Sequence, residues 1–405
     1  MSTPDYQQAL GRKIAAERRR RGLSQPELAR MIDRSVAWVS QVERGVRKVD
    51  RMSVLETLAS ALDIPLAELA AEAPVVAAVT EEPPGAGELR LVLSGVHMLR
   101  AMLGGGRAPA VSTLRSKVSK AWDLTHAGRY TELTDLLHNL VPDLETAART
   151  APENQRAEAF ELLATTYQGC SAALAKLGEP DVAWIAADRA MAAAERAGDP
   201  LLVAAGAYRL VFVFIADRHY GQAEETARTT ADALSPMAGE GNEQAMSLQG
   251  GLTLQRAIIA ARTNDADTAY GQLERASQLA GELGEGRNDY NTEFGPANVG
   301  LYEIAVAVEL GDAGRALRVA ATVDTAGLSA ERRARMLIDV ARAHAQRRQV
   351  TEGVAALREA EEITPEQVRS HELVRLLVAD LLTMQHPPSG ELRGLAGRLT
   401  ATNLS

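Results

Sequence analysis

Basic side chains gather near the amino terminus of this 405-residue chain. Between residues 12 and 51 the sequence holds 12 lysines and arginines against five aspartates and glutamates. Residues 1–70 carry a net charge of +3, whereas residues 71–405 carry −12. A local excess of positive charge attracts polyanions such as nucleic acids, although a basic helix face is more often only solvated. The asymmetry suggests a small polyanion-binding head on an acidic body.

The sequence contains no pattern of reactive side chains typical of a catalyst or a metal site. Seven histidines are present, and none forms a His-x-x-x-His or Glu-x-x-His pair. Gly-x-Ser-x-Gly, Walker and dinucleotide-binding motifs are missing, and the glycine run at 104–106 lacks the lysine of a phosphate-binding loop. We therefore expect no enzyme, no cofactor and no metal.

Cysteine content and hydropathy indicate the cellular compartment in which the protein functions. Cys170 is the only cysteine, which excludes an intramolecular disulfide and indicates a reducing compartment. The longest apolar stretch, residues 201–216, contains Arg209 and is shorter than the roughly 20 residues needed to span a bilayer. The start of the chain lacks a signal-peptide pattern. We expect a cytoplasmic protein that does not enter a membrane.

Start and stop signals divide the amino-terminal segment into short helices. Gly22 ends the first helix, and Ser24 with Glu27 three residues later predicts a capping box for the second. Ser35 caps a third helix that runs to about Glu43. Two more short helices complete a predicted bundle of five, at residues 53–61 and 65–69. Two short helices joined by a tight turn are typical of a helix-turn-helix module.

Three runs, at residues 23–29, 35–45 and 55–62, resemble the Cro/repressor or xenobiotic-response-element (XRE) family of DNA-binding proteins. The resemblance implies that residues 36–44 form the recognition helix, which enters the major groove of double-stranded DNA. The three- and four-residue spacing of apolar side chains predicts the core, with Leu28, Ile32, Val39, Val42, Leu55 and Leu58.

The resemblance also implies which side chains contact DNA. Gln41 matches the position that reads base edges, where a glutamine can pair with adenine. Gln25 matches a position that grips a phosphate, and two basic residues follow the recognition helix. The expected DNA-contacting residues are Gln25, Ser35, Val36, Ala37, Trp38, Ser40, Gln41, Arg44, Arg47 and Lys48.

The start of the recognition helix departs from the family pattern. Residues 36–38 are Val-Ala-Trp, where many members have polar residues, so apolar contact with thymine methyl groups is expected there. In an alternative interpretation, the Trp38 side chain packs against the underside of the head and does not contact DNA. Glu43 would repel phosphate, and we expect it to be structural, paired with Arg30 or Arg18.

Residues 71–110 are predicted to form a linker and a connecting helix, and residues 111–405 carry an internal repeat. The linker is rich in alanine, proline and glycine.

In the repeat, small residues recur after short polar turns, at Ala183-Ala187-Ala190, Ala223-Ala227-Thr230, Ala269-Leu273-Ala276, Ala316-Ala320-Val323 and Gly353-Leu357-Ala360. Small residues let two antiparallel helices approach closely, and stacked hairpins bury the faces that one pair cannot. The repeat resembles tetratricopeptide repeats and predicts an α-solenoid.

A solenoid curves into a groove that could bind a ligand, and one segment supports this. Residues 285–298 place rare side-chain types between two hairpins, and an asparagine at 298 could pair with a peptide amide. The candidate ligand-binding residues are Trp184, Tyr208, Arg209, Asn288, Tyr290, Phe294 and Asn298. The alternative is an ordinary loop whose aromatic side chains fill the core, with the charged candidates in buried ion pairs.

Together these patterns predict an all-α protein with a five-helix helix-turn-helix domain at residues 1–70 and a solenoid at residues 111–405. We expect a sequence-specific transcriptional regulator that binds double-stranded DNA as a homodimer. The solenoid would supply the two-fold contact and sense a peptide or small-molecule effector. A second hypothesis is a protein-interaction adaptor that the head tethers to DNA, without ligand sensing.

Overall fold

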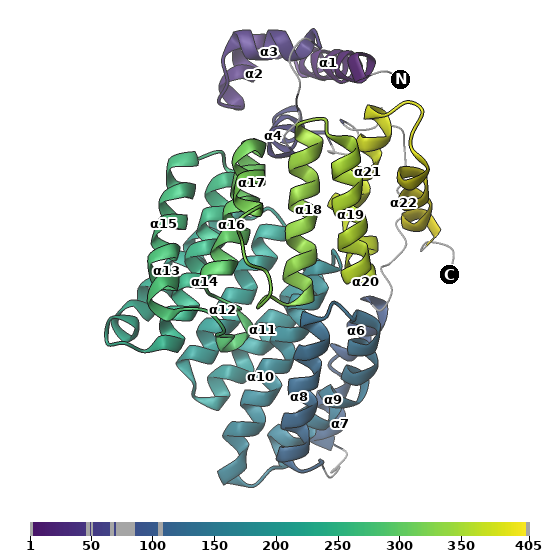
Figure 1. The fold of residues 1–405 in the computed structure, drawn as a ribbon. Helices are drawn as coiled ribbons and strands as arrows, with labels where there is room; N and C mark the ends of the chain where they lie inside the picture. The colour runs from purple at the N-terminus through teal and green to yellow at the C-terminus, as the bar shows by residue number, and fades with distance from the viewer. Residues whose placement is uncertain are drawn as a thin grey trace.

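The computed structural model describes residues 3–45, 49, 52–64, 69, 86–103 and 108–401. Every regular element in these ranges is a helix, so the all-α prediction is confirmed (Figure 1). The head, residues 1–70, contains α1 (Thr3–Arg20), α2 (Gln25–Met31), α3 (Val36–Glu43) and α4 (Met52–Leu62). Apart from Leu69, the fifth helix expected at residues 65–69 lies outside the described residues.

The connecting segment, residues 71–110, contains two described helices and the body, residues 111–405, contains the rest. The helices of the connecting segment are α6 (Ala86–Val92) and α7 (Val96–Leu103). The body begins with α8 (Val111–His126), α9 (Tyr130–Thr150), α10 (Glu153–Lys176), α11 (Pro180–Ala197), α12 (Pro200–Ala216), α13 (Tyr220–Gly239), α14 (Glu243–Arg262) and α15 (Ala266–Leu283). It continues with a short 3-10 turn (Asp289–Asn291), α16 (Pro296–Leu310), α17 (Ala313–Ala320), α18 (Ala330–Gln346), α19 (Val350–Ile363), α20 (Pro365–Ser370), α21 (Glu372–Met384) and α22 (Gly390–Ala401). Among the described helices, none is both long and apolar enough for a membrane crossing.

The body consists of helical hairpins stacked side by side, as the repeat predicts (Figure 1). The first helices of the hairpins form an inner layer in which each contacts the next, in the order α8, α10, α12, α14, α16 and α18. The second helices cover this layer, and they carry the small residues of the repeat. Ala183, Ala223, Ala269 and Ala316 are fully buried, because each lies where an outer helix crosses its neighbours.

The two ends of the inner layer meet. Helix α18 contacts α8, although more than 200 residues of sequence separate them. Beside this contact the backbone N–H and the hydroxyl of Thr131 both donate to Glu366 Oε2, at 2.9 and 3.1 Å. The superhelix therefore brings its first and last inner helices into contact, and the buried side chain of Arg209 lies on the inner layer between them.

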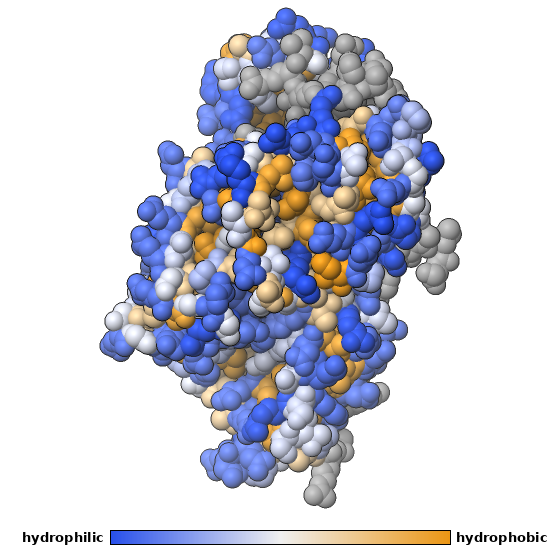
Figure 2. Space-filling view, viewed as in Figure 1, coloured by the Kyte–Doolittle hydropathy of each residue, from blue (hydrophilic) through white to orange (hydrophobic). Residues whose placement is uncertain are grey.

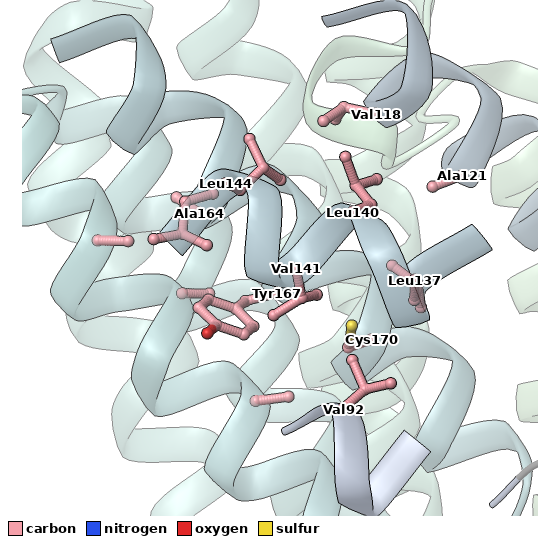
Figure 3. Packing of buried hydrophobic residues seen from close by; sticks show 14 of the residues in the cluster. Val92, Val118, Ala121, Leu137, Leu140, Val141, Leu144, Ala164, Tyr167 and Cys170 are labelled. Carbon is pink, nitrogen blue, oxygen red and sulfur yellow. The ribbon is translucent and has the colours of Figure 1, made fainter. Parts of the chain in front are cut away.

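Apolar side chains from several helices fill the body's first core (Figure 3). Val141 of α9 lies beside Tyr167 of α10 there, Leu140 points toward Val118 of α8, and Val92 of α6 joins the same cluster. The cysteine, Cys170, is fully buried in this core, and burial raises the pKa of its thiol to about 12. The thiol therefore acts as a small apolar side chain and not as a nucleophile.

Candidate functional site

Side-chain caps define the two helices that join at the turn of the head. Ser24 Oγ accepts a hydrogen bond from the backbone N–H of Glu27, whose carboxylate accepts one from the N–H of Ser24 at 2.7 Å. Ser35 Oγ accepts from the N–H of Trp38 at 3.1 Å and so begins α3. Asp33 takes a positive φ of 50° in the turn between them. Both predicted caps are confirmed.

A buried polar network fixes α3 against α1 and α2. Arg18 Nε donates to Glu43 Oε1 at 2.6 Å, and Gln25 Nε2 donates to Glu43 Oε2 at 2.7 Å. The hydrogen bond to Glu43 raises the pKa of Arg18 above its ordinary value. The structural role predicted for Glu43 is confirmed, with Arg18 as its partner. Because Gln25 holds Glu43 with one amide N–H, its contact with a phosphate stays a prediction.

A glycine that the sequence reasoning missed lets α1 approach α3. A Cβ atom at Gly11 would lie 2.3 Å from the carbonyl oxygen of Val42 and 2.7 Å from that of Glu43. Distances this short are essentially never observed, so only glycine fits at this crossing. A glycine inside an otherwise helical pattern was the one signal in the sequence that could have indicated it.

The outer face of α3 is open to solvent. Val36 is 44% exposed, Ala37 and Arg44 are exposed, and Gln41 is half-buried. Trp38 is half-buried, packs against the head core and lies 5.9 Å beneath the guanidinium of Arg34. The predicted core residues Leu28, Ile32, Val39, Val42, Leu55 and Leu58 are buried, as expected. One side of α3 therefore anchors it while the other presents side chains outward.

The remaining predicted residues of the head divide into two groups. Ser40 is half-buried, and its carbonyl oxygen accepts from Arg44 Nε at 3.1 Å, which holds the arginine along the last turn of α3. Arg47 and Lys48 lie outside the described residues. Their phosphate contacts stay predictions.

In the body, the structure brings three of the predicted ligand-binding residues together, namely Tyr208, Arg209 and Tyr290. Arg209 of α12 is buried, and its guanidinium lies 5.0 Å from the rings of both Trp122 and Tyr208. Its Nη2 donates to the carbonyl oxygens of Tyr290 and Asn291 at 3.0 and 2.8 Å. Arg209 thereby ties the loop at residues 289–291 to the inner layer.

The other predicted ligand-binding residues have different surroundings. Phe294 is buried against Gly250, where a Cβ would lie 2.0 Å from its ring, so this aromatic fills the core as the alternative interpretation expected. Asn288 Oδ1 accepts from the N–H of Glu293 at 3.0 Å within the loop. Trp184 is 40% exposed on the outer helix α11, edge-to-face with Phe214. Their contacts with a ligand stay predictions.

Buried charges that the sequence did not indicate fill the axis of the superhelix. Glu331 lies 3.1 Å from Lys176 Nζ, and although burial alone would raise the pKa of its carboxyl, the surrounding cations hold it at about 2. Glu293 accepts from the backbone N–H and hydroxyl of Ser329 and lies 3.5 Å from Arg332 Nε. These pairs join segments that are far apart in sequence, so no local pattern could reveal them.

Two half-buried histidines should make the body sensitive to acid. Burial lowers the pKa of His126 to about 4, and burial together with Arg342 and Arg335 lowers that of His371 to about 4. An unfolded histidine takes up a proton near pH 6.5, so the free energy of unfolding should fall progressively from about pH 6.5 to about pH 4. Denaturant unfolding of the wild type and of His371→Gln across this range checks the prediction, since the variant should lose less stability. Equal slopes for the two proteins would contradict it.

Comparison with known proteins identifies the type of domain that the head forms. The sequence model of a helix-turn-helix domain family matches residues 9–71. The head is a helix-turn-helix domain. The solved structure of Bacillus thuringiensis PlcR in complex with the peptide PapR7 and DNA is similar, with 16% sequence identity and a TM-score of 0.28. The alignment covers 68% of this chain and 95% of PlcR. No curated protein matches the chain significantly.

The chain thus joins a helix-turn-helix domain to a body of helical repeats. Within the matched residues, α2 and α3 are the two short helices joined by a tight turn. Among the described residues, no group of three or more metal-ligating side chains occurs.

Proposed function

We propose that the protein is a transcriptional regulator that binds specific sequences of double-stranded DNA. The observation that carries this proposal is the exposed outer face of α3. Ser35 caps this helix, and hydrogen bonds among Arg18, Glu43 and Gln25 fix its position in the head. A helix fixed in this way can enter the major groove without further ordering, and its first residues then meet base edges. Selection of binding sites from a randomised pool of duplex DNA by the full-length protein tests the proposal.

Gln41 is the side chain proposed to read a base. Replacing it by alanine should lower the affinity for the selected site by about 1–3 kcal/mol and relax the preference at one base pair. Arg47→Ala is the comparison variant, because loss of a phosphate contact weakens binding to all sequences about equally and reduces the salt dependence. Fluorescence anisotropy on specific and scrambled duplexes measures both. An unchanged preference in Gln41→Ala would reject the role in base reading.

The proposed regulator acts as a homodimer, and an apolar surface on the connecting segment supports this. Six of the ten exposed large hydrophobic side chains in the described chain lie on α6 and α7. We call them the connecting patch, which consists of Leu91, Val96, Met98, Leu99, Met102 and Leu103, 44–78% exposed. The opposite side of α6 is buried in the body's first core through Leu89, Val92 and Leu93. A group of large apolar side chains exposed close together is typical of a protein–protein contact.

Charge favours a second copy of this chain as the occupant of the connecting patch. Residues 71–405 carry a net charge of −12, so two copies repel each other over most of their surfaces. Residues 86–103 hold two arginines, of which Arg90 pairs with Glu179, and one glutamate, so this segment lacks the acidic excess of the body. A surface paired with its own copy across a two-fold axis matches the symmetry of an inverted-repeat DNA site.

The body is proposed to respond to a peptide or small-molecule effector. An effector can regulate DNA binding only if its affinity differs between two arrangements of the dimer, for example two separations of the heads. The closed inner layer, with buried charges on its axis, supports a site inside the body whose occupation alters how the hairpins pack.

A further inference from the structure

Side chains from several inner helices hold one loop of the body, residues 289–293, which we call the inner loop. Arg209 of α12 donates to two of its backbone carbonyl oxygens. Nη2 of Arg332, on α18, donates to the carbonyl oxygen of Thr292 at 3.0 Å, and the hydroxyl of Thr292 shares a hydrogen bond of 3.1 Å with Ser247 of α14. The inner loop therefore connects helices that do not follow each other in the stack.

The inner loop also contacts both ends of the inner layer. Glu293 accepts from the backbone N–H and hydroxyl of Ser329, which begins α18, and its carboxylate lies 3.5 Å from Arg332 Nε. The same carboxylate lies 3.6 Å from His126 Nε2 on α8. At the other end of the loop, the Tyr290 side chain packs against both the first and the second hydrophobic core of the body. One short segment thus touches most of the inner layer.

The backbone of the inner loop is held in a conformation that its residues seldom adopt. Tyr290, Asn291 and Glu293 have positive φ angles of 49°, 57° and 51°. The other non-glycine residues with positive φ in the described chain each stand alone within two residues of the end of a helix, at Asp33, Asp63, Arg218, Asn264 and Arg348. Left-handed backbone at bulky or charged residues persists only where the surrounding contacts impose it. The inner loop should therefore relax once those contacts are lost.

The two ends of the inner layer meet at a seam, the contact between α8 and α18 and the segments beside it. Neighbouring hairpins pack through apolar side chains, as where hydrophobic side chains gather around α17 and α18 in Figure 2. No hydrophobic cluster of the described residues contains side chains of both α8 and α18. Across the seam, Lys176 pairs with Glu331 and Thr131 donates to Glu366. Water can replace such polar contacts at modest net cost, so the seam separates more readily than two hairpins joined by an apolar core.

We propose that the inner loop is a latch that keeps the seam closed. While Arg209 and Arg332 hold its carbonyl groups, Glu293 contacts both α8 and α18. When the loop leaves these donors, its left-handed residues relax, Glu293 withdraws from both helices and the seam opens. Helices α6 and α7 pack on α9, directly after α8, so opening moves the connecting patch relative to α18. The latch is thus the moving part of the proposed effector response, and its regulatory role rests on that response.

Double electron–electron resonance on the full-length protein measures the seam. Spin labels are attached at Glu132→Cys and Glu362→Cys, two exposed positions on opposite sides of the seam. Cys170 is fully buried and stays unlabelled. We expect one short distance between the labels in the otherwise wild-type protein, and a second, longer distance in variants that release the inner loop.

Two variants release the inner loop and a third is the matched control. Arg209→Gln removes the guanidinium that holds two carbonyl groups, and Glu293→Gln removes the charge that faces Arg332 but can still accept from the backbone at the start of α18. Arg256→Gln is the control, because Arg256 also lies on an inner helix, α14, but pairs with Glu224 of the outer helix α13 at 2.7 Å. It should keep the short distance. Circular dichroism confirms that each variant folds.

Hydrogen exchange provides a second readout. In Arg209→Gln the backbone amides of the inner loop and of the seam should exchange about tenfold faster or more, while those of α14 should keep their wild-type rates. A wild-type seam distance in both release variants, or an equally open seam in Arg256→Gln, would overturn the proposal. Faster exchange of the inner loop without a longer seam distance would overturn it too, because the loop would then be released without controlling the seam.

These measurements need neither DNA nor an effector, so they separate the latch from the proposed function. Failure to select a DNA site would remove the regulator while the seam distances still decide the latch. If a DNA site is found and Arg209→Gln opens the seam, the affinity of this variant for that site should differ from the wild-type value. Equal affinities would overturn the regulatory role of the latch.

Discussion

Gly11→Ala is expected to unfold the head and abolish DNA binding while the body remains folded. The added Cβ would lie 2.3 Å and 2.7 Å from two carbonyl oxygens of α3. Backbone atoms cannot rotate away as a flexible side chain can, so α1 and α3 must separate. The expected loss is about 3 kcal/mol, a large part of the stability of so small a domain.

Gel shift on the selected DNA site and limited proteolysis measure this loss, with cleavage expected in the head alone. Gly271→Ala is the matched control, because a Cβ at this glycine inside α15 meets no atom within 4 Å. It should stabilise the protein by about 0.5–1 kcal/mol, the usual gain for alanine over glycine in a helix. Wild-type DNA affinity in Gly11→Ala would show that the helices do not cross as closely as the structure has them.

Leu99→Glu combined with Met102→Glu is expected to convert the proposed dimer to a monomer and to weaken binding to an inverted-repeat site by about 100-fold or more. The two side chains are 53% and 67% exposed in the connecting patch, so the charges cost nothing in the monomer. In a dimer they would be buried beside their own copies, where like charges without partners are strongly unfavourable. Loss of the second head removes the gain from binding both half-sites.

Light scattering after size exclusion and gel shift on full and half sites check this outcome. Ile185→Glu is the control, because Ile185 is a similarly exposed apolar residue, 49% exposed, that lies on α11 outside the connecting patch. It should leave both the dimer and the DNA affinity unchanged. A double variant that remains dimeric would place the two-fold contact elsewhere on the chain.

Local features of the head could be predicted from the sequence because neighbours along the chain create them. A cap and its partner are three residues apart, as in Ser24 with Glu27, so their types and spacing determine the hydrogen bonds. The buried positions of α2 and α3 follow from the helical period in the same way. The structural role of Glu43 followed from the argument that an acidic group on this helix needs a basic partner. The sequence left Arg30 and Arg18 as candidates, and the structure shows that Arg18 is the partner.

The closure of the body could not be predicted, because its contacts join residues that share no local pattern. The repeat predicts that hairpins stack, but the curvature of the stack depends on small rotations between neighbours that the sequence does not display. Whether α18 contacts α8 depends on the sum of those rotations. The packing of Phe294 in the core against Gly250 likewise depends on how the hairpins meet.

The sequence by itself determined the helical class, the caps and core of the head, and the small-residue crossings of the body, since each depends on residues a few positions apart. Only the tertiary structure decided which charges meet on the axis, as in the pair formed by Lys176 and Glu331. Electrostatic pairing depends on distance in space, and in a closed superhelix that distance is set by the packing of every hairpin between the two residues.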